Sequence, residues 1–502
     1  KEPEIATHYW HLGLAYLLQE KEEKAQSTWL FVFAQGTEQE IEQWTDQLVE
    51  ILETEAQRLE FNENYHLSWL VRAHLREIAP QLINNLLHLI QLDIQLERFV
   101  PAKLNNWQVN ELLQSSPPEA VEENLLLQLL EKILQFPTIE SVAFAKVSLL
   151  QASNSEVFIE KIVSIANSMA YEHNYPIYAA DLTKLAIEQQ PDNLSLIKYL
   201  FWFYRISQNY EETLEVAQQF YDKCNSLPLK IFANYQFLYV YMTRANWLEL
   251  QPIAQRHIAL LKEMVAQQPQ TIEPYISDSF LIVTQPLLYF QDNPQENRWL
   301  QNQVSKLFQE NIQATQSKAV LPLQVKEERR RLKIGYIAHT LRAHSVGWLS
   351  RWLFQYHDRE AFQIAIYLPN QQEDGITQEW FKKKVDLAYS FPRNVRAMVE
   401  QIQKDEIDIL VDLDSVTLNL TCQVMAQKPA PIQVTWLGLD ASGLPAIDYF
   451  IADPYVLPED AQSYYQEKIW RLPHTYIAVN GFEVGVPTLR RDELDIPDDA
   501  II

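Results

Sequence analysis

The distribution of glycine divides this sequence into two parts. Only two of its nine glycines, Gly13 and Gly36, fall within the first 330 residues, and the other seven follow Arg331. Helix interiors disfavour glycine by roughly 1 kcal/mol relative to alanine, whereas the turns and close backbone approaches of α/β domains need it. The chain is therefore expected to begin as an all-helical array and to continue as an α/β domain.

The helical part carries traces of a repeat. Residues 9–29 match the pattern of a tetratricopeptide unit, in which large and small side chains interlock between two antiparallel helices. The matching residues are Tyr9, Leu12, Gly13, Tyr16, Ala25 and Trp29. A weaker copy begins at Leu194, and prolines interrupt the apolar periodicity between and beyond the copies. We predict a tetratricopeptide-like solenoid with degenerate repeats over residues 1–320. Its expected role is binding of proteins, and a purely structural scaffold is the alternative.

The apolar pattern changes its period at Leu332. Short apolar runs then alternate with helical segments, as expected for a parallel sheet that helices cover on both faces. The predicted strands are 332–338, 362–368, 409–413 and 432–437, and the predicted helices are 345–356, 378–385, 395–404 and 420–427. This order predicts a Rossmann-like lobe over residues 321–502. The motifs GxGxxG and GxxxxGKS do not occur, so nothing favours a dinucleotide dehydrogenase or a P-loop enzyme.

Polar residues, together with two glycines, follow three of the predicted strands. They are His339 and His344 after the first, Asp412, Asp414 and Thr417 after the third, and Gly438, Asp440, Ser442 and Gly443 after the fourth. Ligands of open parallel sheets bind outside the carboxyl ends of the strands, so these loops predict an active-site cleft. His344 is the candidate catalytic residue, and its alternative role is that of a helix-start residue whose ring contacts the backbone. Asp412 and Asp414 could also hold a divalent cation, although Asp-x-Asp is a short and common pattern.

Composition limits the partners and the compartment. The formal charge of −25 argues against nucleic acid or an anionic membrane surface as partner, since phosphate binding depends on clustered Lys and Arg. No stretch of about 20 apolar residues lacks charges, so no membrane span is predicted. Cys224 and Cys422 have no CxxC partner, which favours two small buried side chains in a reducing compartment, the cytoplasm.

Four blocks in the second part resemble the catalytic region of the O-GlcNAc transferase and SPINDLY family. In chain order they are LKIGYIAHTLRAHSVGWL, IDILVDLDSVTLN, AQKPAPIQVTWLGLDASGLPAIDYFIADPYVLPE and YYQEKIWRLPHTYI. The resemblance implies transfer of a sugar from a nucleotide donor, UDP-GlcNAc above all, to Ser or Thr hydroxyls of intracellular proteins, with no metal or other cofactor. It also implies a GT-B enzyme whose first lobe is the α/β part. The nucleotide-binding second lobe would begin about where this chain ends, so the chain alone is expected to be inactive.

The resemblance also assigns roles by position. His344 matches the family's active-site histidine, and Thr417 matches a threonine near the donor pyrophosphate, beside Asp414. His339, Gly438, Ser442 and Gly443 would support the loops or the acceptor. The chain departs from the family pattern at Ala343, Ser345, Trp348 and Asp414. Because Asp414 adds a negative charge where donor phosphates are expected, a non-catalytic adaptor with a degenerate lobe is the alternative.

Overall fold

The computed structural model describes residues 4–269, 271–277, 279–316, 331–369, 373–392, 394–481, 488–497 and 499–501. The chain divides into two compact units, Lys1–Lys223 and Cys224–Ile502. The boundary predicted near residue 320 lies outside the described residues. No helix in the described part of the chain is long and apolar enough to cross a membrane.

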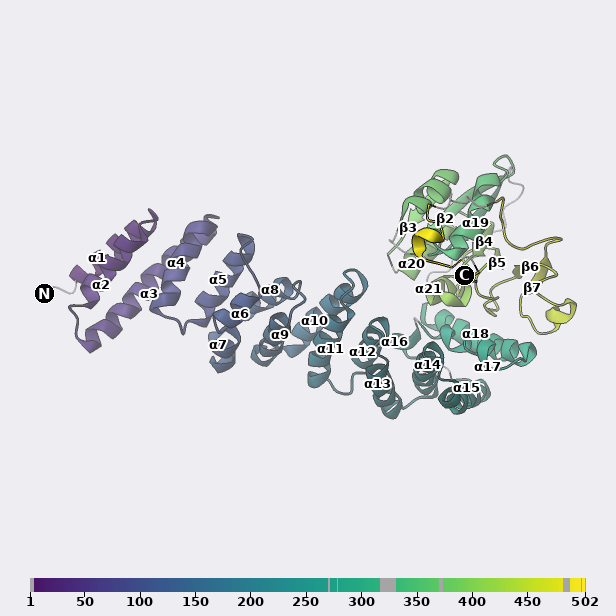
Figure 1. Ribbon diagram of the computed structural model, residues 1–502, viewed down its shortest axis with the longest axis horizontal. Coiled ribbons are helices and arrows are strands. Elements are labelled where there is room, and N and C mark those ends of the chain that lie inside the picture. Colours follow the sequence, from purple (N-terminus) through teal and green to yellow (C-terminus); the bar gives the residue numbers. More distant parts are fainter. Residues whose placement is uncertain are drawn as a thin grey trace. The chain divides into compact units, whose positions relative to one another are not determined.

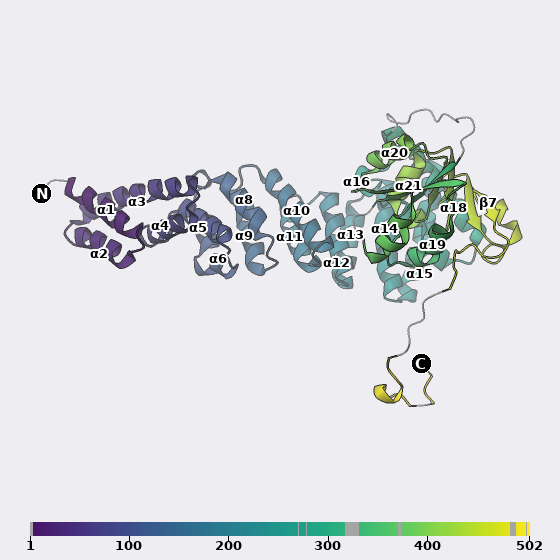
Figure 2. The same ribbon diagram turned by 90° about the horizontal axis from the view of Figure 1, so that it is seen from above.

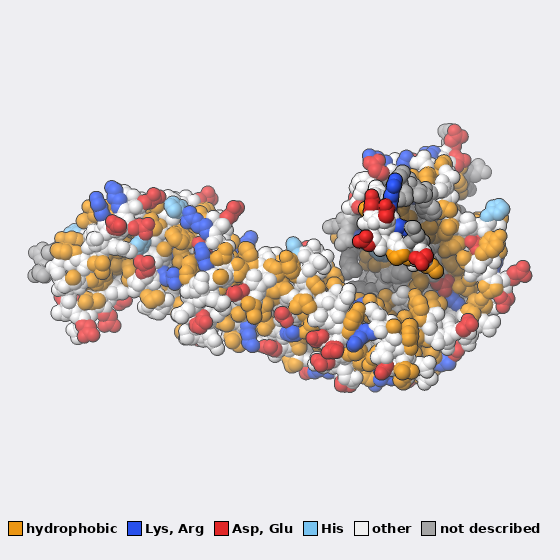
Figure 3. All heavy atoms as spheres, viewed as in Figure 1, with side chains coloured by type: hydrophobic (Ala, Val, Ile, Leu, Met, Phe, Trp, Pro, Cys, Tyr) orange, Lys and Arg blue, Asp and Glu red, His pale blue; other side chains and the backbone are white. Residues whose placement is uncertain are grey.

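The described residues of the first unit form helices that follow one another in chain order and pack on their neighbours (Figures 1 and 2). They are α1 (Glu4–Leu17), α2 (Glu22–Phe33), α3 (Glu38–Phe61), α4 (Tyr65–Ile78), α5 (Ile83–Gln95), α6 (Ala102–Asn106), α7 (Val109–Ser115), η1 (Pro118–Ala120), α8 (Glu123–Ile133), α9 (Ile139–Gln151), α10 (Ser155–Tyr171), α11 (Pro176–Gln189), α12 (Leu194–Ile206) and α13 (Tyr210–Lys223). This arrangement confirms the predicted solenoid. On the face shown in Figure 3, acidic and basic side chains are interspersed.

The first predicted repeat is α1 with α2. A Cβ atom on Gly13 would lie 2.1 Å from Nε1 of Trp29, so only glycine lets the two helices approach this closely. The same indole nitrogen donates a hydrogen bond of 3.2 Å to the carbonyl of Trp10. The small-against-large pairing that the sequence pattern predicts is therefore present.

The second unit begins with helices and continues as the sheet-bearing lobe. The helices are α14 (Leu227–Thr243), α15 (Trp247–Gln267), α16 (Pro274–Ser277), η2 (Leu281–Thr284), α17 (Leu287–Phe290) and α18 (Pro294–Gln316). The strands are β1 (Leu332–Ile337), β2 (Phe362–Leu368), β3 (Leu387–Ser390), β4 (Ile409–Asp412), β5 (Ile432–Thr435), β6 (Tyr449–Ala452) and β7 (Lys468–Arg471). They form one sheet of order β3-β2-β1-β4-β5-β6-β7, in which every pairing is parallel.

The intervening helices complete the lobe. They are α19 (Ser345–Tyr356), η3 (Thr377–Phe381), η4 (Lys382–Lys384), α20 (Val395–Lys404), η5 (Ser415–Thr417), α21 (Asn419–Ala426), η6 (Glu459–Ser463) and η7 (Asp492–Leu494). The four predicted strands are confirmed, as are the predicted helices now called α19, α20 and α21. The helix predicted at 378–385 is instead a π-helical turn followed by a 3-10 turn, and β3, β6 and β7 were not predicted.

Candidate active site

The strand order places the predicted site residues at one point. From β1 the chain moves outward to β2 and β3, and then returns to β4 on the other side of β1. Such a reversal leaves a crevice at the carboxyl ends of the two central strands, where open α/β sheets bind ligands. Ile337 at the end of β1 pairs with Asp412 at the end of β4. The loops that carry His339, His344 and Asp414 therefore start side by side.

Asp414 joins these two loops. Its Oδ2 atom accepts a hydrogen bond of 2.8 Å from the backbone N–H of His339, and its Oδ1 atom accepts one of 2.8 Å from the hydroxyl of Thr340. Nδ1 of His339 also lies 2.9 Å from Oδ2, without a hydrogen bond. The Asp414 side chain is fully buried. The Asp414 carboxylate is therefore hydrogen-bonded to the loop after β1.

Asp412 turns inward as well. Its Oδ1 atom accepts hydrogen bonds from the backbone N–H groups of Asp414, at 2.9 Å, and of Ser415, at 3.2 Å. Burial, followed by the nearby charge of Asp414, raises the pKa of Asp412 to about 7. Asp412 thus binds the backbone of its own loop, whereas Asp414 binds the loop after β1. The described residues contain no cluster of three or more potential metal ligands.

His344 begins helix α19. Its Nδ1 atom accepts a hydrogen bond of 3.2 Å from the backbone N–H of Val346, which satisfies a free donor of the first helical turn. The helix-start role considered for this residue is therefore confirmed. Because Nδ1 is an acceptor, the neutral ring carries its proton on Nε2. Burial, with the charges of His339 and Arg342, lowers the pKa of His344, so the neutral form is favoured at neutral pH. The ring centroids of His339 and His344 lie 6.2 Å apart.

The loop after β5 packs on the loop after β4. A Cβ atom on Gly438 would lie 2.8 Å from Cβ of Ser415 and 3.0 Å from the carbonyl of Asp414, so glycine is needed for the close approach. The hydroxyl of Ser415 donates to the carbonyl of Asp440. Thr417 is exposed, and its hydroxyl donates to the carbonyl of Asp414.

Ser442 and Gly443 lie further along the same loop and contact helix α18. The carbonyl of Ser442 accepts a hydrogen bond of 2.7 Å from the hydroxyl of Ser305. Gly443 has a φ of +75°, which favours glycine, and a Cβ atom there would lie 2.8 Å from Oδ1 of Asn302. The structure thus brings His339, His344, Asp414 and Gly438 together around the crevice, whereas Ser442 and Gly443 face α18.

Arg298 is the important residue that the sequence did not reveal. Its guanidinium donates to the carbonyl of Ala441 at 2.6 Å, to Oδ2 of Asp440 at 3.3 Å and to Oε2 of Glu467 at 3.4 Å. It also lies 4.3 Å from the ring centroid of Tyr465. The side chain is 2% exposed, and that of Glu467 is fully buried. Helix α18 therefore holds the loop after β5 through hydrogen bonds, and this loop in turn packs on the loop of Asp414.

Comparison with known proteins agrees with this architecture. Residues 287–486 match the family model described as glycosyl transferase family 41. The match begins at Leu287 in α17 and so includes all of α18.

Several relatives share the same region. The chain is 32% identical over 158 residues to a Petunia hybrida protein named probable UDP-N-acetylglucosamine–peptide N-acetylglucosaminyltransferase SPINDLY, which covers 30% of this chain and 17% of that protein. It is 34% identical over 154 residues to the rice (Oryza sativa subsp. japonica) protein of the same name, covering 30% and 16%. For the Arabidopsis thaliana protein called SEC, identity is 28% over 195 residues, covering 37% and 20%. The matches thus span at most a fifth of these relatives' own lengths.

A solved structure, of a mutant of the Thermobaculum terrenum O-GlcNAc transferase, covers 65% of this chain and 59% of its own, with a TM-score of 0.48 and 20% identity. The resemblance drawn from the sequence blocks is confirmed by the family match and by the SPINDLY and SEC relatives. Residues 287–486, which contain α18, the seven-stranded sheet and the loops of His344 and Asp414, form a glycosyl transferase family 41 domain of the O-GlcNAc transferase and SPINDLY kind.

Proposed function

We propose that this protein is a glycosyltransferase that moves a sugar from a nucleotide donor, UDP-GlcNAc, to Ser or Thr hydroxyls of proteins that its helical array binds. The observation that carries the proposal is His344. It lies after β1 at the crevice of a family 41 domain, with its Nε2 atom free of any hydrogen-bond partner among the described residues. The relatives whose names include N-acetylglucosaminyltransferase support the choice of sugar.

The proposed chemistry is a direct displacement. The acceptor oxygen forms a bond to the anomeric carbon of the sugar, the bond from that carbon to the diphosphate oxygen breaks, and the hydroxyl proton is released. The products are the glycosylated side chain, the nucleoside diphosphate and a proton. We assign no metal or other cofactor to this reaction.

In this reaction His344 acts as a hydrogen-bond donor that orients the acceptor oxygen. A general base would need a free lone pair on Nε2 and therefore a proton on Nδ1, which would break the hydrogen bond from Val346 that caps α19. The lowered pKa of His344 keeps the ring neutral, so that it donates through Nε2 without carrying a charge.

We assign Thr417 to the donor side of this arrangement. Its exposure in the loop of Asp414 supports a contact with the donor pyrophosphate. The Asp414 carboxylate already accepts two hydrogen bonds from the loop after β1. These bonds reduce its electrostatic repulsion of the donor phosphates.

Calorimetry with UDP-GlcNAc, UDP and GDP-fucose tests the proposal on this chain and on a form extended through the natural C-terminus. The extended form should bind one donor, and transfer to a peptide should then be measurable. His344→Asn is the matched variant, because asparagine is also a good N-cap but cannot reproduce the Nε2 donor. It should retain donor affinity and lose transfer by about 100-fold. If neither form binds a donor, the adaptor alternative replaces the enzyme.

A further inference from the structure

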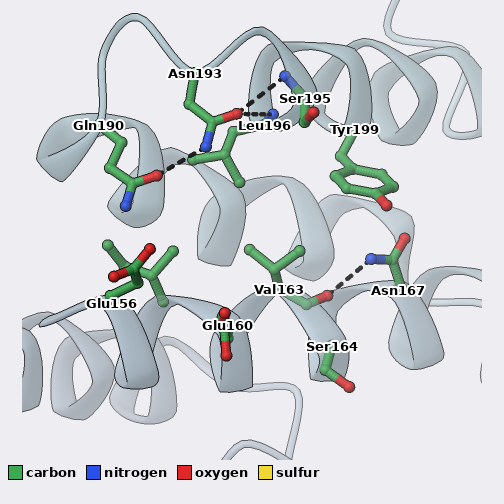
Figure 4. A pocket seen from close by; sticks show the side chains of 11 residues that line it. Glu156, Glu160, Val163, Ser164, Asn167, Gln190, Asn193, Ser195, Leu196 and Tyr199 are labelled. Atoms are coloured by element: carbon green, nitrogen blue, oxygen red, sulfur yellow. Dashed lines mark hydrogen bonds between the residues drawn. The ribbon is translucent and has the colours of Figure 1, made fainter. Parts of the chain in front are cut away.

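The first unit contains a groove between α10 and α12, with a cavity of about 430 Å³. Figure 4 shows Glu156, Glu160 and Asn167 of α10 along one wall, and Gln190 with the start of α12 opposite. All of its lining residues belong to this unit. A cavity of this size accommodates one large side chain together with part of a peptide backbone.

The two acidic residues of this groove are not paired with basic side chains of the described residues. Glu156 and Glu160 are exposed, lie one turn apart on α10, and form no ion pair with any residue that the structure describes. Some other carboxylates of the unit are paired, such as Glu131 with Lys161. Two like charges at positions i and i+4 of a helix repel each other, so a cation between them would relieve an unfavourable arrangement.

The bottom of the groove is apolar. The side chains of Ile159 and Leu196 are each 4% exposed, and Val163 is half-buried between the two walls. An apolar floor beneath a carboxylate rim suits the aliphatic stem and cationic head of Lys or Arg. An anion would meet the two carboxylates, and the described residues offer no three-ligand set for a metal ion.

Two amides provide for a peptide backbone. Oε1 of Gln190 accepts from Asn193, and the Gln190 Nε2 group donates to none of the described residues. The Nδ2 group of Asn167 donates to the carbonyl of Val163, and Asn167 Oδ1 accepts from no group in the described part of the chain. These groups stand on opposite walls, toward opposite ends of the groove (Figure 4). A carbonyl and an N–H of an extended chain can therefore be bound at separate points.

We propose that this groove binds an extended peptide segment through a Lys or Arg side chain whose charged head lies between Glu156 and Glu160. Gln190 and Asn167 hold the main chain, and Ile159 and Leu196 pack on the aliphatic stem. The proposal deepens the proposed function, since the peptide would belong to a protein substrate, but the binding event can be measured without any transfer.

The probe is a fluorescein-labelled nine-residue peptide of alternating Ala and Lys, measured by fluorescence anisotropy with the full chain. Glu156→Gln with Glu160→Gln removes two charges and keeps the shape of the groove. The matched control is Glu211→Gln with Glu215→Gln on α13, an exposed acidic pair at the same spacing outside the groove. The groove variant should weaken binding about tenfold and the control less than twofold.

A second peptide, in which every Lys is acetylated, keeps the backbone and removes the charge. It should bind at least tenfold more weakly than the first peptide. Equal losses in both double variants would mean that the peptide binds the overall negative charge of the protein, and equal binding of the acetylated peptide would mean that no cation site exists. Either result overturns the proposal. If the peptide binds but the extended form binds no donor, the proposed enzyme activity is refuted and the proposed peptide site stands.

Discussion

Replacing Arg298 by methionine tests whether helix α18 holds the loop after β5. The side chain is 2% exposed and donates to Asp440, Ala441, Glu467 and Asn302, so the variant removes four hydrogen bonds at once. It also leaves the fully buried Glu467 without its positive partner. Breaking a buried ion pair by removing one partner costs about 3 to 5 kcal/mol, and we expect the second unit to lose stability in that range.

The expected loss depends on pH. Burial raises the pKa of Glu467, so this residue favours the folded state most at low pH and loses that contribution as the pH rises through its folded pKa. Without Arg298 the carboxylate is costlier to bury, and protonation relieves the cost. The difference between variant and wild type should therefore be smaller at pH 5 than at pH 8.

Hydrogen exchange with mass spectrometry during urea unfolding is the suitable assay, because it reports the two units separately. Exchange should accelerate in peptides from α14 to β7 and remain unchanged in α1 to α13. Arg396→Met is the matched control, since Arg396 forms an exposed i,i+4 pair with Glu400 in the same unit, and it should leave exchange unchanged. A loss below about 1 kcal/mol in the Arg298 variant would refute the reasoning, because it would be within the range of a surface pair.

Three further changes probe the crevice. His344→Ala should cost about 1 kcal/mol through loss of the α19 cap, whereas His344→Asn should be nearly neutral, as calorimetric unfolding can show; equal losses would contradict the cap. Asp412 has a folded pKa of about 7, above its ordinary value of about 3.9, so it stabilises the protein at low pH and destabilises it by up to about 1.4 kcal/mol per unit as the pH rises toward 7. The unfolding free energy of Asp412→Asn, measured in urea at several pH values, should lack this slope. If the variant and the wild type show the same pH dependence, the raised pKa of Asp412 is refuted. Gly438→Ala should cost about 1 to 3 kcal/mol in thermal unfolding because its Cβ would strike Ser415, and an unchanged melting temperature would show that the loop yields.

The sequence revealed four inner strands of the sheet but neither the edge strands β3 and β7 nor the inner strand β6, and for the edges there is a physical reason. The strands β1, β2, β4 and β5 lie inside the sheet and read as largely apolar runs, with exceptions such as Lys333, Gln363 and Gln433. The edge strands β3 and β7 span four residues each, and their side chains alternate between half-buried and exposed. So short an alternation is weak evidence for a strand. The segment 378–385 has helical composition, but part of it forms a π turn that no periodicity reveals.

The site was predictable only in outline. The rule that ligands bind at the carboxyl ends of parallel strands was enough to bring His344 and Asp414 together. It could not indicate that Asp414 turns inward to accept hydrogen bonds from the His339 backbone and the Thr340 hydroxyl, because that depends on loop conformation. Nor could it identify Arg298, since α18 reads as a polar surface helix and only the folded structure shows its arginine buried.

Helix α18 also determines how this protein can be divided. A fragment that started at β1 would have the complete sheet but would leave the carbonyls of Ala441 and Ser442 without the donors that Arg298 and Ser305 supply. The buried carboxylate of Glu467 would also lose its positive partner, Arg298. A piece with all these bonds must include helix α18, which begins at Pro294, and the family match starts close by, at residue 287. The structural unit of this lobe is therefore the sheet together with the helix that precedes it.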